Sequence, residues 1–389
     1  MTGTSQGRLF SHPYLRYSTS SSGVLRRGIL KTIVLQIRAL DINMKNRKLL
    51  MISTDRLIFD EKSSVRARQI EYAKEWEEVR IIVFSAKSKV QSEQISENCW
   101  VYSTNSSCKF LYPFDAIKIG RKIIREKNIR EITCQDSSLT AIAGVALKKK
   151  FGLPLEIQIH GDIGSPYFAR SITNKIRLVL AKKYLPKADK IRVVSNRIKD
   201  YVEKVLERNS HRKVRPVIEV RPIEVNIEEI KNSPIVVDLR RKYKQFSHIV
   251  LMASRLEKEK NIELAIDAWQ SVVKSFPKAG LVIVGRGSEV LDLKKMVVSK
   301  SLTKSIVFED WVDKGTLYSY YKTADIFLNT SLFEGYGMTL VEAQSAGCKI
   351  VSTDVGVATE VGSVIVRHDA FDLSEKLKET LSKIFIDKI

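Results

Sequence analysis

The chain has 389 residues and a net charge of +22, with 66 lysines and arginines against 44 aspartates and glutamates. This length allows about two to three ordinary domains with a sizeable core. A hydrophobic content of 44% and a charged content of 28% are typical of a globular protein. The basic excess favours a negatively charged partner, either nucleic acid, an anionic membrane or a phosphorylated substrate, unless it reflects a general lysine bias.

Three classes of feature are absent from the sequence or weak in it. No apolar run reaches the length of a bilayer span, and five histidines argue against a histidine-rich metal cage. Four cysteines lack metal-ligand spacing, so we expect buried free thiols in a reducing cytosol. They are Cys99, Cys108, Cys134 and Cys348.

The first 43 residues differ from the rest of the chain. No acidic residue precedes Asp41, basic residues recur, and serines cluster at "STSSS". An organelle transit peptide has this composition, and so does a disordered basic tail or a start assigned too far upstream. Met44 opens a segment that leads directly into a predicted strand, so we expect residues 1–43 to be an extension outside the fold.

The next 150 residues alternate β-rich runs with amphipathic stretches, in the order of a parallel, doubly wound sheet. We expect a helix capped by Asp115, and another that starts at Ser137 or Ser138 and stops at Gly152. Predicted strands cover 48–53, 80–85, 129–135, 155–160 and 190–195, and a further helix covers 63–79.

Residues 205–247 are charged and irregular, which indicates a domain junction, and a second alternating series follows it. We therefore expect a Rossmann-like domain at 44–235 and another at 236–389. Ligands of such sheets bind beyond the carboxyl ends of the strands, here in the cleft between the domains. Predicted strands cover 248–254, 280–285, 305–310, 324–330 and 349–356, with helices from Asn261, near 289–300, at 337–346 and at 371–385.

The segment "SLFEGYGMTLVEA" carries two glutamates, Glu334 and Glu342, with seven residues between them. A strand enters this segment and a helix leaves it, so the helix N-terminus should point at the cleft and offer free amides to an anion. Carboxylates accept hydrogen bonds from vicinal sugar hydroxyls. The layout fits a nucleotide sugar, with Glu334 on the hexose, Glu342 on the ribose, and the diphosphate at the turn formed by Gly335, Gly337, Met338 and Thr339.

This segment resembles the signature of retaining glycosyltransferases of family 4, the glycosyl transferases group 1, which have the GT-B fold. The resemblance covers about 248–366 strongly, including the downstream Glu360, and about 48–200 loosely. It implies that Arg255 and Lys260, in "ASRLEKEKN", neutralise a leaving diphosphate without metal. Consistently, no Asp-x-Asp pair occurs anywhere in the chain. No cofactor other than the donor nucleotide sugar is implied.

In the N-terminal half, the resemblance places His160 near the transferred sugar, although an ordinary loop histidine would look the same. Asp136, at the end of another strand, is a candidate for the acceptor hydroxyl. The glycine pair Gly285 and Gly287 fits either a nucleotide turn or a simple strand-to-helix turn. The basic amphipathic stretch 170–190 favours a helix with its apolar face in the core, and the alternative is contact with anionic lipid.

Three features depart from the family. The loop after the first strand has no glycine, "RPIEVN" replaces the usual proline-asparagine-glycine linker, and the sequence stops soon after its last helix. We expect a cytoplasmic enzyme, with or without peripheral contact with the inner membrane, that acts on a glycan or lipid-linked acceptor. A nucleotide-sugar hydrolase or epimerase, an inactive scaffold and a basic nucleic-acid-binding protein are the alternatives, and no nucleic-acid module supports the last.

Overall fold

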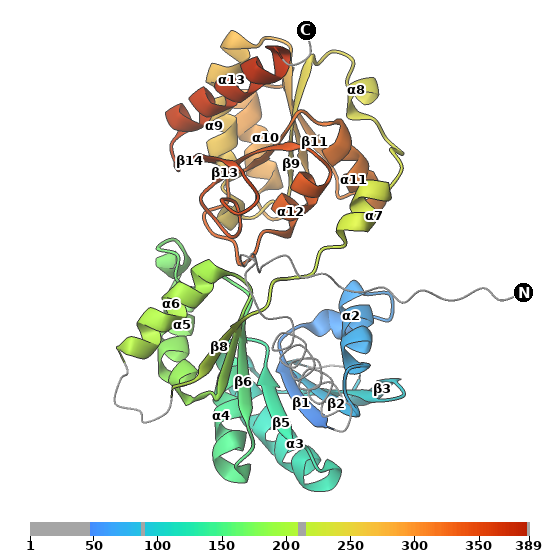
Figure 1. Cartoon of the computed structure of the whole chain (residues 1–389), viewed down its shortest axis with the longest axis vertical. Coiled ribbons are helices and arrows are strands. Elements are labelled where there is room, and N and C mark those ends of the chain that lie inside the picture. Colours follow the sequence, from blue (N-terminus) through green and yellow to red (C-terminus); the bar gives the residue numbers. More distant parts are fainter. Residues whose placement is uncertain (1–46, 87–89, 209–214, 387–389) are drawn as a thin grey trace, which may run out of the picture.

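The computed structural model describes residues 47–86, 90–208 and 215–386, and the extension expected at 1–43 lies outside these ranges. The described chain forms two α/β units, one above the other in Figure 1. The first contains an eight-stranded sheet in the order β3-β4-β2-β1-β5-β6-β7-β8. The second contains a six-stranded sheet in the order β11-β10-β9-β12-β13-β14. This confirms the predicted architecture of two doubly wound sheets.

The first sheet is parallel except for β3, which pairs antiparallel with β4 at the edge. This hairpin was not expected, because its outer strand "SEQIS" is short and polar. The strands are β1 (Lys48–Ser53), β2 (Glu78–Val83), β3 (Ser92–Ser96), β4 (Cys99–Ser103), β5 (Glu131–Cys134), β6 (Leu155–Ile159), β7 (Lys190–Val193) and β8 (Val217–Val220). The helices are α2 (Ser64–Ala73), α3 (Tyr112–Lys127), α4 (Leu139–Phe151), α5 (Ile172–Tyr184) and α6 (Asn196–Glu207).

Side chains that alternate along the strands build two separate cores. Leu50 and Ile52 of β1 face the cluster that α3, α4 and α6 cover, whereas Leu49 and Met51 face the cluster under α2. This is the period-two pattern of a sheet that is buried on both faces. The parallel order brings the carboxyl ends of β1, β5 and β6 to the edge that meets the second domain.

Two helix boundaries differ from the predictions, and the limits of a third helix agree with them. Helix α2 ends at Ala73, before the expected 63–79 run finishes, and Ser63 caps its start. Asp115 is not a cap, because α3 already begins at Tyr112 with a proline in its first turn. Ser138 occupies the N-cap position of α4 but makes no capping bond, whereas Gly152 ends that helix with φ of 68°, as expected.

The second sheet is entirely parallel and packs between two helical layers. Trp269 of α9 is fully buried on one side, and Tyr321 of α11 is fully buried on the other. The strands are β9 (His248–Ala253), β10 (Ala279–Val284), β11 (Ile306–Glu309), β12 (Ile326–Asn329), β13 (Lys349–Thr353) and β14 (Val364–Val366). The helices are α7 (Ile227–Asn232), α8 (Leu239–Lys242), α9 (Ile262–Ser275), α10 (Val290–Ser299), α11 (Lys314–Thr323), α12 (Met338–Ser345) and α13 (Ala370–Ile386).

The connection between the two units follows β8 directly. Ile230 of α7 is fully buried in the cluster that also contains Leu239 and Tyr321, so α7 packs with the second sheet. The chain therefore passes from one unit to the other through residues 221–226. This connection comes earlier in the sequence than the boundary between residues 235 and 236, which we placed from the change in composition.

Candidate active site

Two strand-end turns of the second domain are joined by hydrogen bonds. The Leu332 backbone N–H donates to the Glu259 carbonyl at 2.8 Å, and the Thr330 hydroxyl donates to the Lys260 carbonyl at 3.0 Å. Lys260 Nζ lies 2.5 Å from Glu334 Oε1, and these side chains are only 15% and 18% exposed. The Ser331 hydroxyl donates to the same carboxylate oxygen at 2.8 Å. Lys260 and Glu334 are thus brought together and held in fixed positions.

Arg255 lies on the same turn as Lys260 but has a different partner. Its Nη2 lies 2.8 Å from Glu259 Oε1, and its side chain is 71% exposed. The two cations predicted to bind a diphosphate, Arg255 and Lys260, therefore lie on one turn. Each of them is neutralised by its own glutamate. A bound anion would have to compete with Glu259 for Arg255 and with Glu334 for Lys260.

The glycines of "VGRGSEV" are required by a close approach between turns. A β-carbon on Gly285, which has φ of +144°, would lie 1.9 Å from the Ser254 carbonyl oxygen. One on Gly287 would lie 2.1 Å from the Leu256 carbonyl oxygen. The turn after β10 therefore packs directly on the turn that carries Arg255. Between these turns, the Leu256 N–H donates to the Arg286 carbonyl at 2.8 Å.

Helix α12 begins after Gly337, whose φ of +89° suits glycine. Gly337, Met338 and Thr339 thus lie at the helix N-terminus, where amides lack partners within the helix. One turn further on, Glu342 accepts a hydrogen bond from the Tyr321 hydroxyl at 3.1 Å. Burial raises the pKa of Glu342 above its ordinary value, and the Tyr321 bond opposes this shift.

The loop after β12 also contacts the first domain. A β-carbon on Gly335 would lie 1.7 Å from the His160 carbonyl oxygen, so only glycine fits this contact. The Ser195 hydroxyl donates to the Gly335 carbonyl at 3.2 Å. The contact brings His160, from the end of β6, beside the Glu334 turn. Sequence reasoning missed Ser195, since a serine before a helix is normally interpreted as a cap.

His160 keeps a solvent-exposed surface, although protein atoms surround much of its side chain. This burial lowers its pKa below the ordinary value, and the charges of Arg192 and Arg68 lower it further. The charge of Asp136 opposes the shift, so the two predicted residues of the first domain are electrostatic neighbours. At neutral pH the His160 imidazole is therefore uncharged and can both donate and accept a hydrogen bond.

Asp136 helps to start α4. Its Oδ1 accepts hydrogen bonds from the Ser138 N–H and the Ser138 hydroxyl, both at 2.6 Å. Its Oδ2 is buried and has no hydrogen-bond partner among the residues that the structure describes. One carboxylate oxygen therefore has a local structural role, whereas the other is buried without a hydrogen bond from the described residues.

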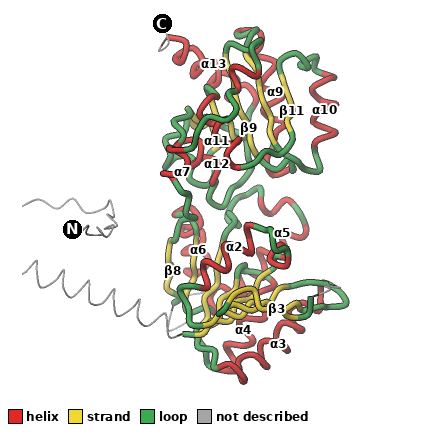
Figure 2. Tube along the Cα trace, turned by 90° about the vertical axis from the view of Figure 1, so that its right-hand side faces the viewer, coloured by secondary structure: helices red, strands yellow, loops and turns green. Residues whose placement is uncertain are grey.

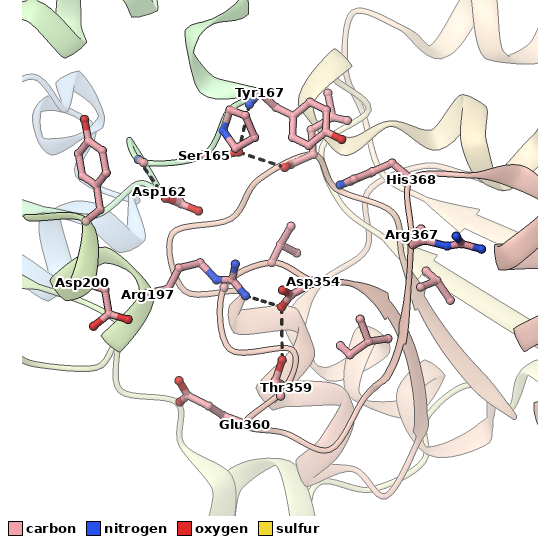
Figure 3. Close-up of a pocket in the computed structure, with 18 of the residues that line it drawn as sticks. Asp162, Ser165, Tyr167, Arg197, Asp200, Asp354, Thr359, Glu360, Arg367 and His368 are labelled. Carbon is pink, nitrogen blue, oxygen red and sulfur yellow. Dashed lines mark hydrogen bonds and ion pairs between the residues drawn. The ribbon is translucent and has the colours of Figure 1, made fainter. Parts of the chain in front are cut away.

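A cavity of about 940 Å³ lies between the domains, and Leu332 of the loop that carries Glu334 lines it (Figure 3). Arg197 of α6 forms an ion pair with Asp354 across it, and the Thr359 hydroxyl donates to Asp354 at 3.3 Å. The Tyr167 ring meets the His368 ring edge-on at 4.6 Å between centroids. Lys260, Glu334 and Glu342 do not line this cavity. The sequence predicted a cleft between the domains and singled out Glu360, which lines this cavity. It did not identify the other side chains described here, because the walls come from four segments far apart in the chain.

Other expectations concern metals, thiols and membranes. Within residues 47–86, 90–208 and 215–386, no three histidine, cysteine, aspartate or glutamate side chains come together as a metal site. Cys99, Cys134 and Cys348 are buried and free as expected, but Cys108 is exposed. None of the helices in these ranges is both long enough and apolar enough to cross a bilayer.

The C-terminal domain matches a known family. Residues 240–383 match the family described as "Glycosyl transferases group 1". The alpha-monoglucosyldiacylglycerol synthase of Acholeplasma laidlawii is 34% identical over 103 residues, 26% of each chain. The phosphatidylinositol N-acetylglucosaminyltransferase GPI3 subunit of Saccharomyces cerevisiae strain YJM789 is 26% identical over 289 residues, 73% of this chain and 62% of that protein. The match to the Acholeplasma laidlawii enzyme, the more identical of these two relatives, therefore spans only about a quarter of that protein.

Solved structures show the same arrangement of both domains. Sucrose-phosphate synthase from Thermosynechococcus elongatus has a TM-score of 0.71 at 18% identity, covering 87% of this chain and 90% of that one. Anabaena HepE in complex with UDP-glucose has a TM-score of 0.64 at 18% identity, covering 87% and 90%. Together with the parallel sheets and the Glu334 and Glu342 segment, these findings place the C-terminal domain in the glycosyl transferases group 1 family, within a chain of the GT-B fold.

Proposed function

We propose that this chain is a retaining, metal-independent glycosyltransferase of family 4 that moves a sugar from a nucleotide diphosphate sugar to a hydroxyl acceptor. The observation that carries the proposal is the contact between Lys260 and Glu334 at 2.5 Å, beside the start of α12 and the His160 loop. A cation, helix amides and a fixed carboxylate converge there from strand ends. This set suits a diphosphate joined to a sugar.

In the proposed reaction, Lys260, Arg255 and the amides at 337–339 bind the diphosphate. Their positive charge stabilises the negative charge that develops when the bond between the anomeric carbon and the phosphate oxygen breaks. The acceptor oxygen forms its new bond on the same face of the sugar, and its proton passes to the leaving phosphate. Glu334 orients the sugar, Glu342 binds the ribose, and neutral His160 hydrogen-bonds the sugar from the first domain.

The donor is proposed to carry uridine. Support comes from the solved relatives, since Anabaena HepE was crystallised with UDP and with UDP-glucose. The contacts described above identify no side chain that would select the nucleobase. A second candidate function, hydrolysis or epimerisation of the nucleotide sugar, uses the same donor residues, and only product analysis separates it from transfer.

The acceptor is proposed to be lipid-linked. Loops that follow β1 and β4 expose large apolar side chains, including Leu57 at 59% and Phe110 at 88%, with Phe114 of α3 at 65%. These loops follow carboxyl strand ends, on the edge that faces the second domain. Such a patch suits an apolar ligand. Two relatives are named as enzymes of diacylglycerol and phosphatidylinositol glycosylation. The proposal includes a cytoplasmic, membrane-peripheral location.

The test combines binding with turnover. UDP should raise the melting temperature of the full chain, and Arg255→Ala/Lys260→Ala should abolish this shift because both diphosphate cations are gone. Glu334→Ala should lower turnover by about a hundredfold or more, as expected for loss of a transition-state interaction. UDP affinity should not fall, because Lys260 no longer pairs with Glu334. Product analysis by mass spectrometry, with and without a lipid acceptor, identifies transfer. A folded protein that no nucleotide diphosphate stabilises would contradict the proposal.

A further inference from the structure

Helix α5 presents an apolar stripe to solvent. Ile172, Ile176 and Val179 are 77%, 56% and 65% exposed, and a helical turn of 3.6 residues places them on one side. Ala181, on the opposite side, is the buried residue of α5. The interpretation favoured from the sequence, in which the apolar face lies in the core, is therefore wrong. The structure leaves that face uncovered because only a narrow side of α5 packs on α4.

The same segment carries positive charge only. No acidic residue occurs between Asp162 and Asp189. The basic residues of this segment are Arg170, Lys175, Arg177, Lys182, Lys183 and Lys187. In the described part of the chain, the ion pairs nearest in sequence involve Asp189, Lys190 and Arg197, and none involves these six side chains. Helical spacing places Lys175 and Lys182 along one edge of the stripe and Lys183 at its end.

We propose that α5 is a membrane-docking surface that binds a bilayer containing anionic phospholipids. The apolar stripe would enter the boundary between headgroups and acyl chains, while the flanking lysines would contact the lipid phosphates. The occupant follows from charge complementarity, since an apolar stripe bordered by cations that no described carboxylate neutralises matches an apolar layer under negative headgroups. Pairing with a second copy through this face would bring like charges together, which is unfavourable.

The position of α5 connects this surface to the candidate active site. Figures 1 and 2 show α5 at the end of the first domain that lies next to the second. Just before α5, the Phe168 ring meets the Phe333 ring edge-on at 5.6 Å across the domain boundary. Ser165 and Tyr167, in the same loop, line the interdomain cavity. Docking would therefore hold the cleft at the membrane surface. This inference rests on the proposed function, because it explains how the enzyme would reach a lipid-linked acceptor.

The experiment measures vesicle binding by the full chain without nucleotide. Vesicles of phosphatidylcholine containing about one third phosphatidylglycerol should bind the chain at least about tenfold more tightly than pure phosphatidylcholine. Ile176→Asn/Val179→Asn should weaken this binding by about tenfold or more, because two apolar side chains can no longer enter the bilayer. Lys182→Ser/Lys183→Ser should weaken it to a similar degree, and added salt should reduce the remaining difference between the vesicles.

Matched controls carry the same changes on the second domain. Leu291→Asn/Val298→Asn alters two apolar residues of α10 that are 68% and 64% exposed. Lys274→Ser/Lys278→Ser removes the same charge from exposed positions at the end of α9 and beyond it. Both controls should bind anionic vesicles like the unchanged protein. Circular dichroism and the melting temperature should show that all four variants are folded, since every altered side chain is solvent-exposed.

Three outcomes would overturn the proposal. The first is no binding of the unchanged protein to anionic vesicles, and the second is equal weakening by the α5 variants and their controls. The third is a dimer in light scattering that Ile176→Asn/Val179→Asn abolishes while vesicle binding persists, which would make the stripe a self-association surface. UDP-dependent stabilisation is measured without vesicles, so failure of docking and failure of the donor site remain distinguishable.

Discussion

At the scale of single residues, the carboxylates of the candidate site lie in different surroundings. Glu334 is held by Lys260 and Ser331, which satisfies its charge without a ligand. Glu342 is bonded to Tyr321, a neutral hydroxyl, and burial raises its pKa. A charged group placed this way weakens the folded state unless a ligand supplies hydrogen bonds to it. The proposed ribose would do so.

We therefore predict that Glu342→Gln is at least as stable as the unchanged protein at neutral pH without nucleotide. The folded pKa of Glu342 lies above its unfolded value, so stability associated with the protonated form is lost as pH rises through the folded pKa. Glutamine removes that loss and still accepts the Tyr321 bond. UDP affinity should fall by about tenfold or more, since charge-assisted hydrogen bonds are worth about 1.5–3 kcal/mol.

Melting curves between pH 5 and 8, with and without UDP, check this prediction. Glu379→Gln is the control, because this glutamate is exposed on α13 and its ion-pair partner, Lys376, lies on the same helix. A marked loss of stability in Glu342→Gln, with unchanged UDP affinity, would show that Glu342 serves the fold and not the ligand.

At the scale of elements, the loop between β12 and α12 is a contact between domains as well as a ligand turn. Gly335 leaves no room for a side chain against the His160 carbonyl, and Ser195 donates to its carbonyl. Sequence reasoning assigned this glycine to close approach of a ligand. The structure shows that the His160 backbone of the first domain also approaches this glycine closely.

We expect Gly335→Ala to separate this contact, because the added β-carbon would meet the His160 carbonyl oxygen at 1.7 Å. Displacing packed backbone costs about 1–3 kcal/mol, so the melting temperature should fall and turnover should drop at least about tenfold. Gly161→Ala is the matched control, since a β-carbon there meets nothing within 4 Å. Equal activity and stability in both variants would mean that the contact does not exist in solution.

At the scale of the whole molecule, the domains meet through small contacts. The ion pair between Arg197 and Asp354 has side chains that are 36% and 52% exposed. Solvent screens such pairs, which contribute about 0–1 kcal/mol to stability. The pair borders the 940 Å³ cavity and joins α6 to the loop after β13. Its main effect should therefore be on how closely the domains approach, and not on whether they fold.

We predict that Arg197→Ala changes the free energy of unfolding by no more than about 1 kcal/mol but increases the radius of gyration in solution scattering without ligand. Asp354→Ala should do the same, and the double variant should add little, because either change removes the whole pair. Arg367→Ala, which breaks the pair with Asp372 inside the second domain, is the control. Unchanged scattering together with a loss of several kcal/mol would identify a folding contact instead.

The sequence by itself determined most of the alternating order of strands and helices, the two doubly wound sheets and the spacing of Glu334 and Glu342 in the site. These are local properties, because period-two and period-3.6 patterns, caps and glycines act within a few residues. The same locality explains the errors at Asp115 and at the end of α2, where boundaries depend on neighbours. The polar edge strand β3 carries too weak a pattern to be predicted.

Only the tertiary structure decided which of these parts meet. Lys260 and Glu334 are 74 positions apart, and Ser195 and Gly335 are 140 apart. Contacts at such separations depend on how whole elements pack, which no local pattern encodes. The exposure of the α5 stripe has the same cause. Amphipathic spacing indicates that a helix has an apolar face and a polar face. The packing of its neighbours decides which of these faces remains exposed to solvent.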